Sequence, residues 1–278
     1  MILVVLLWGG NFVSTKIALP DMPPLMLAGA RFGLGALVIF LWGIISKVDL
    51  VPKRDDIFSL LILSLLFASQ IITFNLGVNL TLAGRASIFM SMNPIFVALF
   101  AHLLIPNDRL NLRKIIGLML AFCGIIVIFR DRAGINNARI TGDAILIASA
   151  CIVGFMSIYI KKLAQSINAC KMLLWEMIFG LIPFFGLSMI FESTSQVNLS
   201  QSLVISLLYQ SIVVAGLSFV IWTLLLKRYS ASKISVFTFA MPIFGVALSA
   251  LILNEAVTVY LIIGALLVAS GIYFVNRG

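Results

Sequence analysis

Long apolar stretches follow one another along the whole chain, separated by short connections that carry Pro, Asn, Asp and Lys. An α-helix needs roughly 20 apolar residues to cross the hydrocarbon core of a bilayer, and these stretches have about that length. No polar stretch is long enough for a soluble domain. The pattern therefore predicts an all-α membrane protein, a single integral membrane domain of ten transmembrane helices at 2–19, 24–45, 57–79, 82–105, 113–130, 141–161, 170–191, 201–226, 232–253 and 257–276.

The two halves of the chain resemble each other around a proline. Met92-Asn93-Pro94-Ile95-Phe96 in the fourth predicted helix matches Ala240-Met241-Pro242-Ile243-Phe244 in the ninth. Later positions also correspond: Asp108, Gly117, Gly124 and Arg130 match Glu255, Gly264, Gly271 and Arg277. Five helices per half give the halves opposite orientations. We therefore predict two inverted five-helix repeats at 1–130 and 141–277, a pattern typical of secondary transporters.

The basic residues give the orientation. The chain is 62% hydrophobic and 10% charged, with a formal net charge of +9. Thirteen of its nineteen Lys and Arg residues fall in alternate connections that include the C-terminal end, whereas four fall in the other connections. Positively charged loops stay on the cytoplasmic side, so both termini are predicted to be cytosolic. This distribution explains the positive charge through topology and contact with anionic lipid, without a nucleic-acid partner.

The sequence contains no hydrolytic, redox or ATP-binding motif. His102 is the only histidine, the three cysteines have no CxxC spacing, and no GxxxxGK[ST] loop occurs. We therefore expect neither an enzyme nor a cofactor or metal site. A carrier with this sequence takes its energy from a gradient, with protons as one candidate coupling ion. The oligomeric state is open, with a homodimer as one alternative.

The paired prolines are candidate hinges. A proline lacks the backbone donor of its helix turn and frees the carbonyl four residues earlier, which is Met90 for Pro94 and Thr238 for Pro242. Inside a membrane such a carbonyl needs a neighbour, a water molecule or a substrate. The prolines therefore indicate either two flexing kinks that line a cavity or two packing kinks without a mobile role.

Polar but uncharged residues lie on single faces of several predicted helices. They suit a small polar ligand in a central cavity, or alternatively hydrogen bonds between packed helices. The candidate substrate-binding residues on these faces are Trp8, Asn11, Thr15, Gln70, Thr73, Phe74, Ser91, Asn93, Ser218, Trp222 and Thr238.

Two charged residues inside the predicted spans carry further hypotheses, because intramembrane charge is rare and commonly functional. Arg31 either grips a substrate carboxylate, which adds it to the candidate substrate-binding residues, or extends outward to the membrane surface. Glu176 either carries a coupling proton or forms an interfacial pair with Lys171 or Lys162. Lys16 lies near a helix end and is expected to reach the surface.

The residues of both halves resemble a known family. Leu7-Trp8-Gly9-Gly10-Asn11-Phe12 and Met22-Pro23-Pro24 look like the opening of EamA-type members of the drug/metabolite transporter superfamily, and Ser249-Ala250-Leu251-Ile252-Leu253-Asn254-Glu255 is similar to their second half. Asp108 stands where this family has Glu. The resemblance implies ten helices, a central cavity and export of small metabolites.

We therefore expect a multi-pass protein of a bacterial inner membrane that exports amino acids or derivatives such as O-acetylserine and cysteine by alternating access. The alternatives are a carrier of another metabolite or drug class and a membrane scaffold that transports nothing. A scaffold predicts that the polar faces meet between packed helices and leave no cavity.

Overall fold

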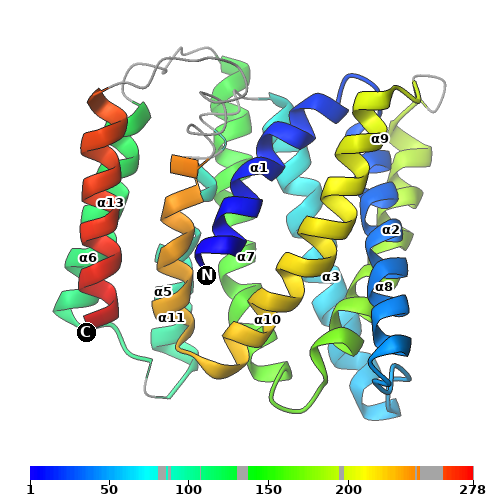
Figure 1. Cartoon of the computed structure of the whole chain (residues 1–278), viewed down its shortest axis with the longest axis horizontal. Helices are drawn as coiled ribbons and strands as arrows, with labels where there is room; N and C mark the ends of the chain where they lie inside the picture. Colours follow the sequence, from blue (N-terminus) through cyan, green and yellow to red (C-terminus); the bar gives the residue numbers. More distant parts are fainter. Residues whose placement is uncertain are drawn as a thin grey trace.

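The computed structural model describes residues 1–80, 86, 89–106, 108–129, 137–193, 197–241, 243–244 and 259–277. This part of the chain is a bundle of helices that run between two opposite ends (Figure 1). Its elements are α1 Ile2–Ala18, α2 Pro24–Ile45, α3 Arg54–Leu80, α5 Asn93–Leu104, α6 Leu112–Phe129, α7 Asn137–Leu163, α8 Ala169–Phe191, α9 Gln201–Leu208, η3 Tyr209–Ser218, α10 Phe219–Arg228, α11 Ala231–Ser235, η4 Val236–Ala240 and α13 Val259–Arg277.

Five of the described helical segments are long and apolar enough to cross a membrane by length and composition. They are residues 24–45, 54–80, 140–163, 169–191 and 201–228, and shorter apolar helices lie at 2–18, 93–104 and 262–277. The predicted segments therefore fold as helices of an integral membrane protein. The total of ten spans stays a prediction.

One predicted helix is interrupted beside its proline, and another changes type shortly before its proline. The fourth breaks at residues 91–92, and α5 begins anew at Asn93 with Pro94 in its first turn. The bonds from Met92 N to the Phe89 carbonyl and from Ile95 N to the Met92 carbonyl span three residues, so the chain tightens there. A proline is tolerated in a first turn because its missing donor has no partner there. In the ninth predicted helix η4 forms a 3₁₀ turn, and Pro242 lies outside the described residues.

Helices that correspond in the two predicted repeats pack against each other. The second contacts the seventh as α2 against α8, the fifth contacts the tenth as α6 against α13, and the fourth contacts the ninth as α5 against α11. The third contacts the sixth as α3 against α7, and the first contacts the eighth as α1 against η3. If each helix is replaced by its counterpart in the other half, each of the first three pairs maps onto itself. The pair α3–α7 then maps onto the pair α1–η3. The contacts therefore have the pattern that two equivalent halves produce.

Glycines bring α6 and α13 into backbone contact along one edge of the bundle (Figure 1). A Cβ atom added to Gly271 would lie 2.5 Å from the Gly117 carbonyl oxygen, and one added to Gly124 would lie 2.7 Å from the Gly264 carbonyl oxygen. The four glycines are the ones that the repeat matches to each other, but each contacts the glycine at the other position of the opposite helix. Small residues let transmembrane helices approach closely, so this interface holds the halves together.

Charged groups connect the halves at both ends of the bundle. Near one end, the Glu192 carboxylate after α8 accepts bonds from the Leu25 and Met26 amides at 2.7 and 2.9 Å and so caps α2. At the other end, Asp108 accepts a 2.8 Å bond from Lys114 Nζ and a bond from the Ser232 hydroxyl at the start of α11.

Asp108 is held in its charged form by these neighbours. Its burial raises the pKa, but the hydrogen bonds from Lys114, Ser232 and Ser230 and the charge of Lys114 outweigh that effect, so the pKa lies below its usual value. The carboxylate that replaces the family's Glu therefore links the two halves at this end.

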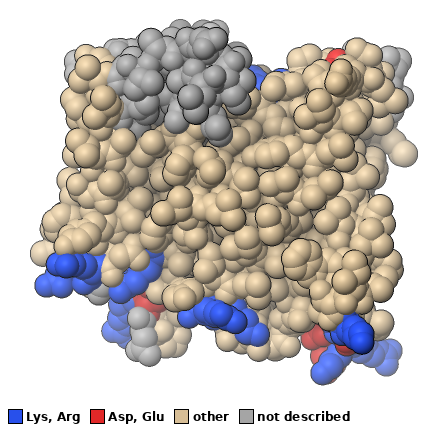
Figure 2. Space-filling view, in the orientation of Figure 1, with Lys and Arg blue, Asp and Glu red and all other residues tan. Residues whose placement is uncertain are grey.

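Lys and Arg side chains gather along one end of the bundle, the end at which α13 finishes (Figure 2). In this view few basic side chains appear at the opposite end. The described basic side chains thus gather at the end that the charge bias assigns to the cytosol. The four basic residues predicted for the other side, Arg85, Arg130, Arg132 and Arg139, lie outside the described side chains.

A Gly271→Ala substitution is expected to lower the free energy of unfolding in detergent by about 1–3 kcal/mol, the usual cost of overpacking. The reason is that the added Cβ would meet the Gly117 backbone. Gly186→Ala is the matched control. It also lies in a helix, but its Cβ meets nothing within 4 Å, so stability should be unchanged or rise slightly. Equal melting temperatures for the two variants would contradict the close contact of α6 with α13.

Single cysteines at Val51 and Val197, introduced into a protein without its three native cysteines, should react from opposite sides of the membrane. Val51 follows α2 and is 72% exposed, and Val197 precedes α9 near the other end of the bundle. An impermeant maleimide should label Val51→Cys from the cytosolic side and Val197→Cys from the outside. Labelling of both from one side would refute the predicted orientation.

Candidate substrate cavity

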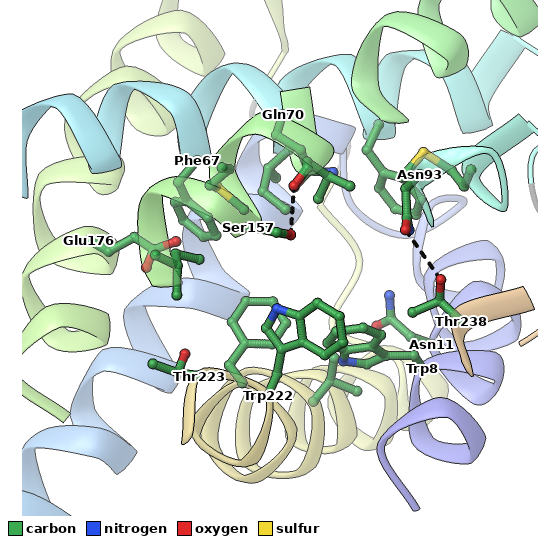
Figure 3. Close-up of a pocket in the computed structure, with 18 of the residues that line it drawn as sticks. Trp8, Asn11, Phe67, Gln70, Asn93, Ser157, Glu176, Trp222, Thr223 and Thr238 are labelled. Carbon is green, nitrogen blue, oxygen red and sulfur yellow. Dashed lines mark hydrogen bonds between the residues drawn. The ribbon is translucent and has the colours of Figure 1, made fainter. Parts of the chain in front are cut away.

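A cavity of about 140 Å³ lies inside the bundle, and residues of both halves line it. Its walls come from α1, α2, α3, α5, α7, α8, η3, α10 and η4, with side chains shown in Figure 3. An apolar cavity of about 150 Å³ in another protein holds benzene, so this space suits a small molecule.

Aromatic side chains form one wall of the cavity. The Trp8 ring lies 5.1 Å from the Trp222 ring and 6.1 Å from the Phe219 ring between centroids, the latter edge-on. Phe67 also lines the cavity and packs edge-on against Phe32 at 4.6 Å. Such rings provide a rigid, largely apolar surface for a ligand.

Several polar atoms in the wall are buried and have no hydrogen-bond partner among the described residues. They come from both halves: Trp8 Nε1, Asn11 Oδ1, Arg31 Nε, Glu176 Oε2 and Thr223 Oγ1. An unpaired polar atom in an apolar interior costs free energy, roughly 1–3 kcal/mol in proteins, so such atoms normally have partners. These five atoms lie where a bound polar molecule or water can supply a partner. Three further unpartnered atoms lie outside the wall, on Thr15, Asn75 and Ser211.

Arg31 points inward. It is 4% exposed, and its Nη1 donates to Gln210 Oε1 at 3.2 Å. Gln210 Nε2 in turn donates to the Ser14 hydroxyl at 3.1 Å, so the guanidinium is held by the opposite half of the chain. The hypothesis that Arg31 extends outward to the membrane surface is therefore wrong. Its Nε remains free at the cavity.

Glu176 also lies in the cavity wall and is 1% exposed. Lys171, one of its two proposed partners, instead donates to Asp49 Oδ2 at 2.8 Å in the connection after α2. The hydrogen bond from Lys171 holds the pKa of the Asp49 carboxyl below its usual value. Lys171 is therefore already engaged and does not neutralise Glu176.

The structure brings most of the predicted site residues together. Those that line the cavity are Trp8, Asn11, Arg31, Gln70, Phe74, Asn93, Trp222, Thr238 and Glu176. Asn93 and Thr238 meet across the two repeats, since the Thr238 hydroxyl donates to Asn93 Oδ1 at 3.2 Å (Figure 3). This bond joins the residue before Pro94 to the residue whose carbonyl Pro242 would free.

Four predicted residues lie outside the cavity wall: Thr15, Thr73, Ser91 and Ser218. The Thr73 hydroxyl donates to the Ser69 and Gln70 carbonyls of its own helix, and the Ser218 hydroxyl donates to the Val213 carbonyl. Thr15 and Ser91 are fully buried away from the cavity. The bonds of Thr73 and Ser218 match packing roles inside the bundle, whereas Thr15 Oγ1 has no partner among the described residues.

Other lining residues were not predicted. Thr223 and Ser157 add hydroxyl groups, and Phe12, Phe67 and Phe219 add aromatic surface. Thr223 directly follows Trp222, a predicted site residue, and this adjacency is the one local indication that Thr223 could line the cavity. The phenylalanines carry no signal, because an apolar ring in a transmembrane helix packs equally well against lipid or core.

Comparisons with known proteins agree with this architecture. A family model described as "EamA-like transporter family" matches residues 1–130 and again residues 140–277. The chain belongs to the EamA-like transporter family. A solved crystal structure superposes with a TM-score of 0.86 over 99% of this chain and 94% of that one. Its sequence is 19% identical, so this likeness concerns the fold.

Two relatives whose names describe a transporter or an efflux pump align with nearly the whole chain. It is 29% identical to "Uncharacterized transporter YoaV" of Bacillus subtilis, with 98% of this chain and 94% of that protein aligned. It is also 29% identical to "Probable amino-acid metabolite efflux pump" of Escherichia coli, over 98% of this chain and 92% of that protein. The chain is thus a full-length match to transporters.

Proposed function

We propose that this transporter is a secondary carrier that exports amino acids or their derivatives by alternating access through the central cavity. The observation that carries the proposal is the set of unpartnered buried polar atoms around a cavity that both halves build. Of the eight buried side-chain atoms that have no partner among the described residues, five lie in this wall, whereas packed helices generally satisfy their polar groups. The cavity therefore favours a carrier over a membrane scaffold.

The charges of the cavity support this substrate class. Arg31 offers a guanidinium donor for a carboxylate, and Glu176 offers a carboxyl group, so a basic and an acidic side chain line one small space. An amino acid carries both charges at neutral pH, and its size suits a cavity of about 140 Å³. The printed name of the Escherichia coli relative points to the same class, which includes O-acetylserine and cysteine.

Two inverted repeats provide the alternating movement in this proposal. Support comes from the double match of the family model and from helix contacts that exchange between the halves. The basic end of the bundle, toward which the C-terminus points, is the cytosolic side in this proposal (Figures 1 and 2). Both termini are assigned to that side, although α1 begins about midway along the bundle (Figure 1), and the bacterial relatives suggest a bacterial inner membrane. Protons remain the candidate coupling ion, with Glu176 as their candidate carrier.

Purified protein in liposomes should accelerate exchange of O-acetylserine or cysteine, assayed with and without a pH gradient. Arg31→Gln should lower the rate by about tenfold or more, because a hydrogen bond to a charged group is lost. Lys16→Gln is the control, since Lys16 is an exposed basic residue outside the cavity wall. Gel-filtration profiles establish that each variant is folded. Failure of the wild type to accelerate exchange of either compound would contradict the proposal.

Pro94→Ala should reduce transport while leaving stability unchanged or higher, because it restores a backbone donor and allows a continuous fourth helix. Pro183→Ala is the control, since Pro183 also lies inside a helix but has no counterpart in the repeat. Pro242→Ala should shift the accessibility of the two mouths opposite to Pro94→Ala. Normal transport and unchanged accessibility in both would assign the prolines to packing.

A further inference from the structure

The Glu176 side chain is a buried carboxyl group without a counter-charge from its surroundings. It is 1% exposed, and its Oε2 has no hydrogen-bond partner among the described residues. The nearest basic residue along α8, Lys171, is bound to Asp49, and Arg31 is bound through Gln210. A buried carboxylate is costly unless something neutralises it. The missing partner must come from what enters the cavity.

Thr223 on α10 supplies a second unpartnered group in the same cavity wall. Its side chain is 1% exposed, its Oγ1 has no partner among the described residues, and α8 packs against α10. Figure 3 shows Glu176 and Thr223 on the same side of the cavity, with the Asn93–Thr238 pair on the other side. By contrast, the Ser157 hydroxyl in the same wall donates to the Val153 carbonyl at 2.8 Å.

We propose that Glu176 and Thr223 form a subsite for the protonated amino group of the substrate, an inference that rests on the proposed amino-acid transport. An ammonium group has three N–H donors and one positive charge. It can donate to Glu176 Oε2 and to Thr223 Oγ1 at once and neutralise the carboxylate. Arg31 in the same cavity remains free to take the carboxylate end.

The arrangement favours an amino group over a proton alone as the partner of Glu176. Glu176 and Thr223 are not hydrogen-bonded to each other, although both are buried in the same wall. A proton on Glu176 would remove the charge but leave the Thr223 hydroxyl without a partner. A donor group that lies between the two oxygens satisfies both, as buried polar groups require.

The subsite has a consequence for specificity. O-acetylserine and N-acetylserine contain the same atoms, but only O-acetylserine has a free amino group that is protonated at neutral pH. A site that is built to pair a charged amine rejects an analogue without it, because its own polar groups are then left unpaired. The wild-type carrier should therefore exchange O-acetylserine much faster than N-acetylserine.

The test measures exchange of both isomers in liposomes, in a mildly acidic buffer that prevents acyl migration. Wild type should prefer O-acetylserine by about tenfold or more, the effect expected for a lost charged hydrogen bond. Glu176→Gln should reduce that preference to about threefold or less, and Thr223→Val should reduce it to an intermediate value. Thr73→Val is the matched control, since the Thr73 hydroxyl is satisfied within α3 and lies outside the cavity wall. It should keep the wild-type preference.

Each outcome decides between the hypotheses. Wild type that exchanges neither isomer refutes the proposed function itself, before the subsite is tested. Wild type that exchanges both equally, or a Glu176→Gln variant that retains the full preference and loses only its response to a pH gradient, overturns the amine subsite and leaves Glu176 as a proton carrier. If Glu176→Gln proves unstable, the preference of Thr223→Val decides, since full preference there also overturns the subsite.

Discussion

Polar atoms inside a membrane protein need partners, because hydrocarbon offers none. In this bundle most buried polar groups find them in neighbouring helices, as Gln70 does with Ser149 and as Asn93 does with Thr238. Eight buried side-chain atoms have no partner among the described residues, and five of them, at Trp8, Asn11, Arg31, Glu176 and Thr223, belong to one cavity wall. The unsatisfied groups are thus concentrated where a substrate can reach them, and the other three lie at Thr15, Asn75 and Ser211.

The interior of the bundle depends on contact between the two halves. Backbone approach at the Gly117–Gly271 and Gly124–Gly264 pairs fixes one edge, and charged groups such as Asp108 and Glu192 join the halves at the ends. Each of these contacts joins an element of one repeat to an element of the other. A cavity enclosed in this way can change its access only when the halves move against each other, which is the movement that inverted repeats support.

Many residues of the cavity wall could be predicted from the sequence, because they recur at helical spacing. The division into two repeats stays a prediction from matched positions in the two halves. Gly117 and Gly124 lie seven residues apart on one face, and Trp8 and Asn11 share another. The spacing of polar residues does not show, however, whether a side chain faces a cavity or bonds to carbonyls of its own helix. Thr73 is an example, because its hydroxyl donates to the Ser69 and Gln70 carbonyls.

A local change of helix type explains a further miss. The sequence analysis placed Ser218 on an inward face, but residues 209–218 form a π-helix, in which hydrogen bonds span five residues. The wider turns shift the register, so Ser218 bonds to Val213 while Trp222 and Thr223 both reach the cavity. No sequence pattern predicted the π-helix. Thr223 was therefore missed for a physical reason rather than for lack of polarity.

The central claim is that the cavity is the place where substrate passes from one side of the membrane to the other. A single cysteine at Ser157, in a protein without its native cysteines, tests it most directly. Ser157 lines the cavity and its hydroxyl bonds only within its own helix, so the substitution should be tolerated. A small impermeant thiol reagent should modify it from either side of the membrane, and O-acetylserine should slow the reaction from both. Modification from one side only, or none until the protein is unfolded, would contradict the account.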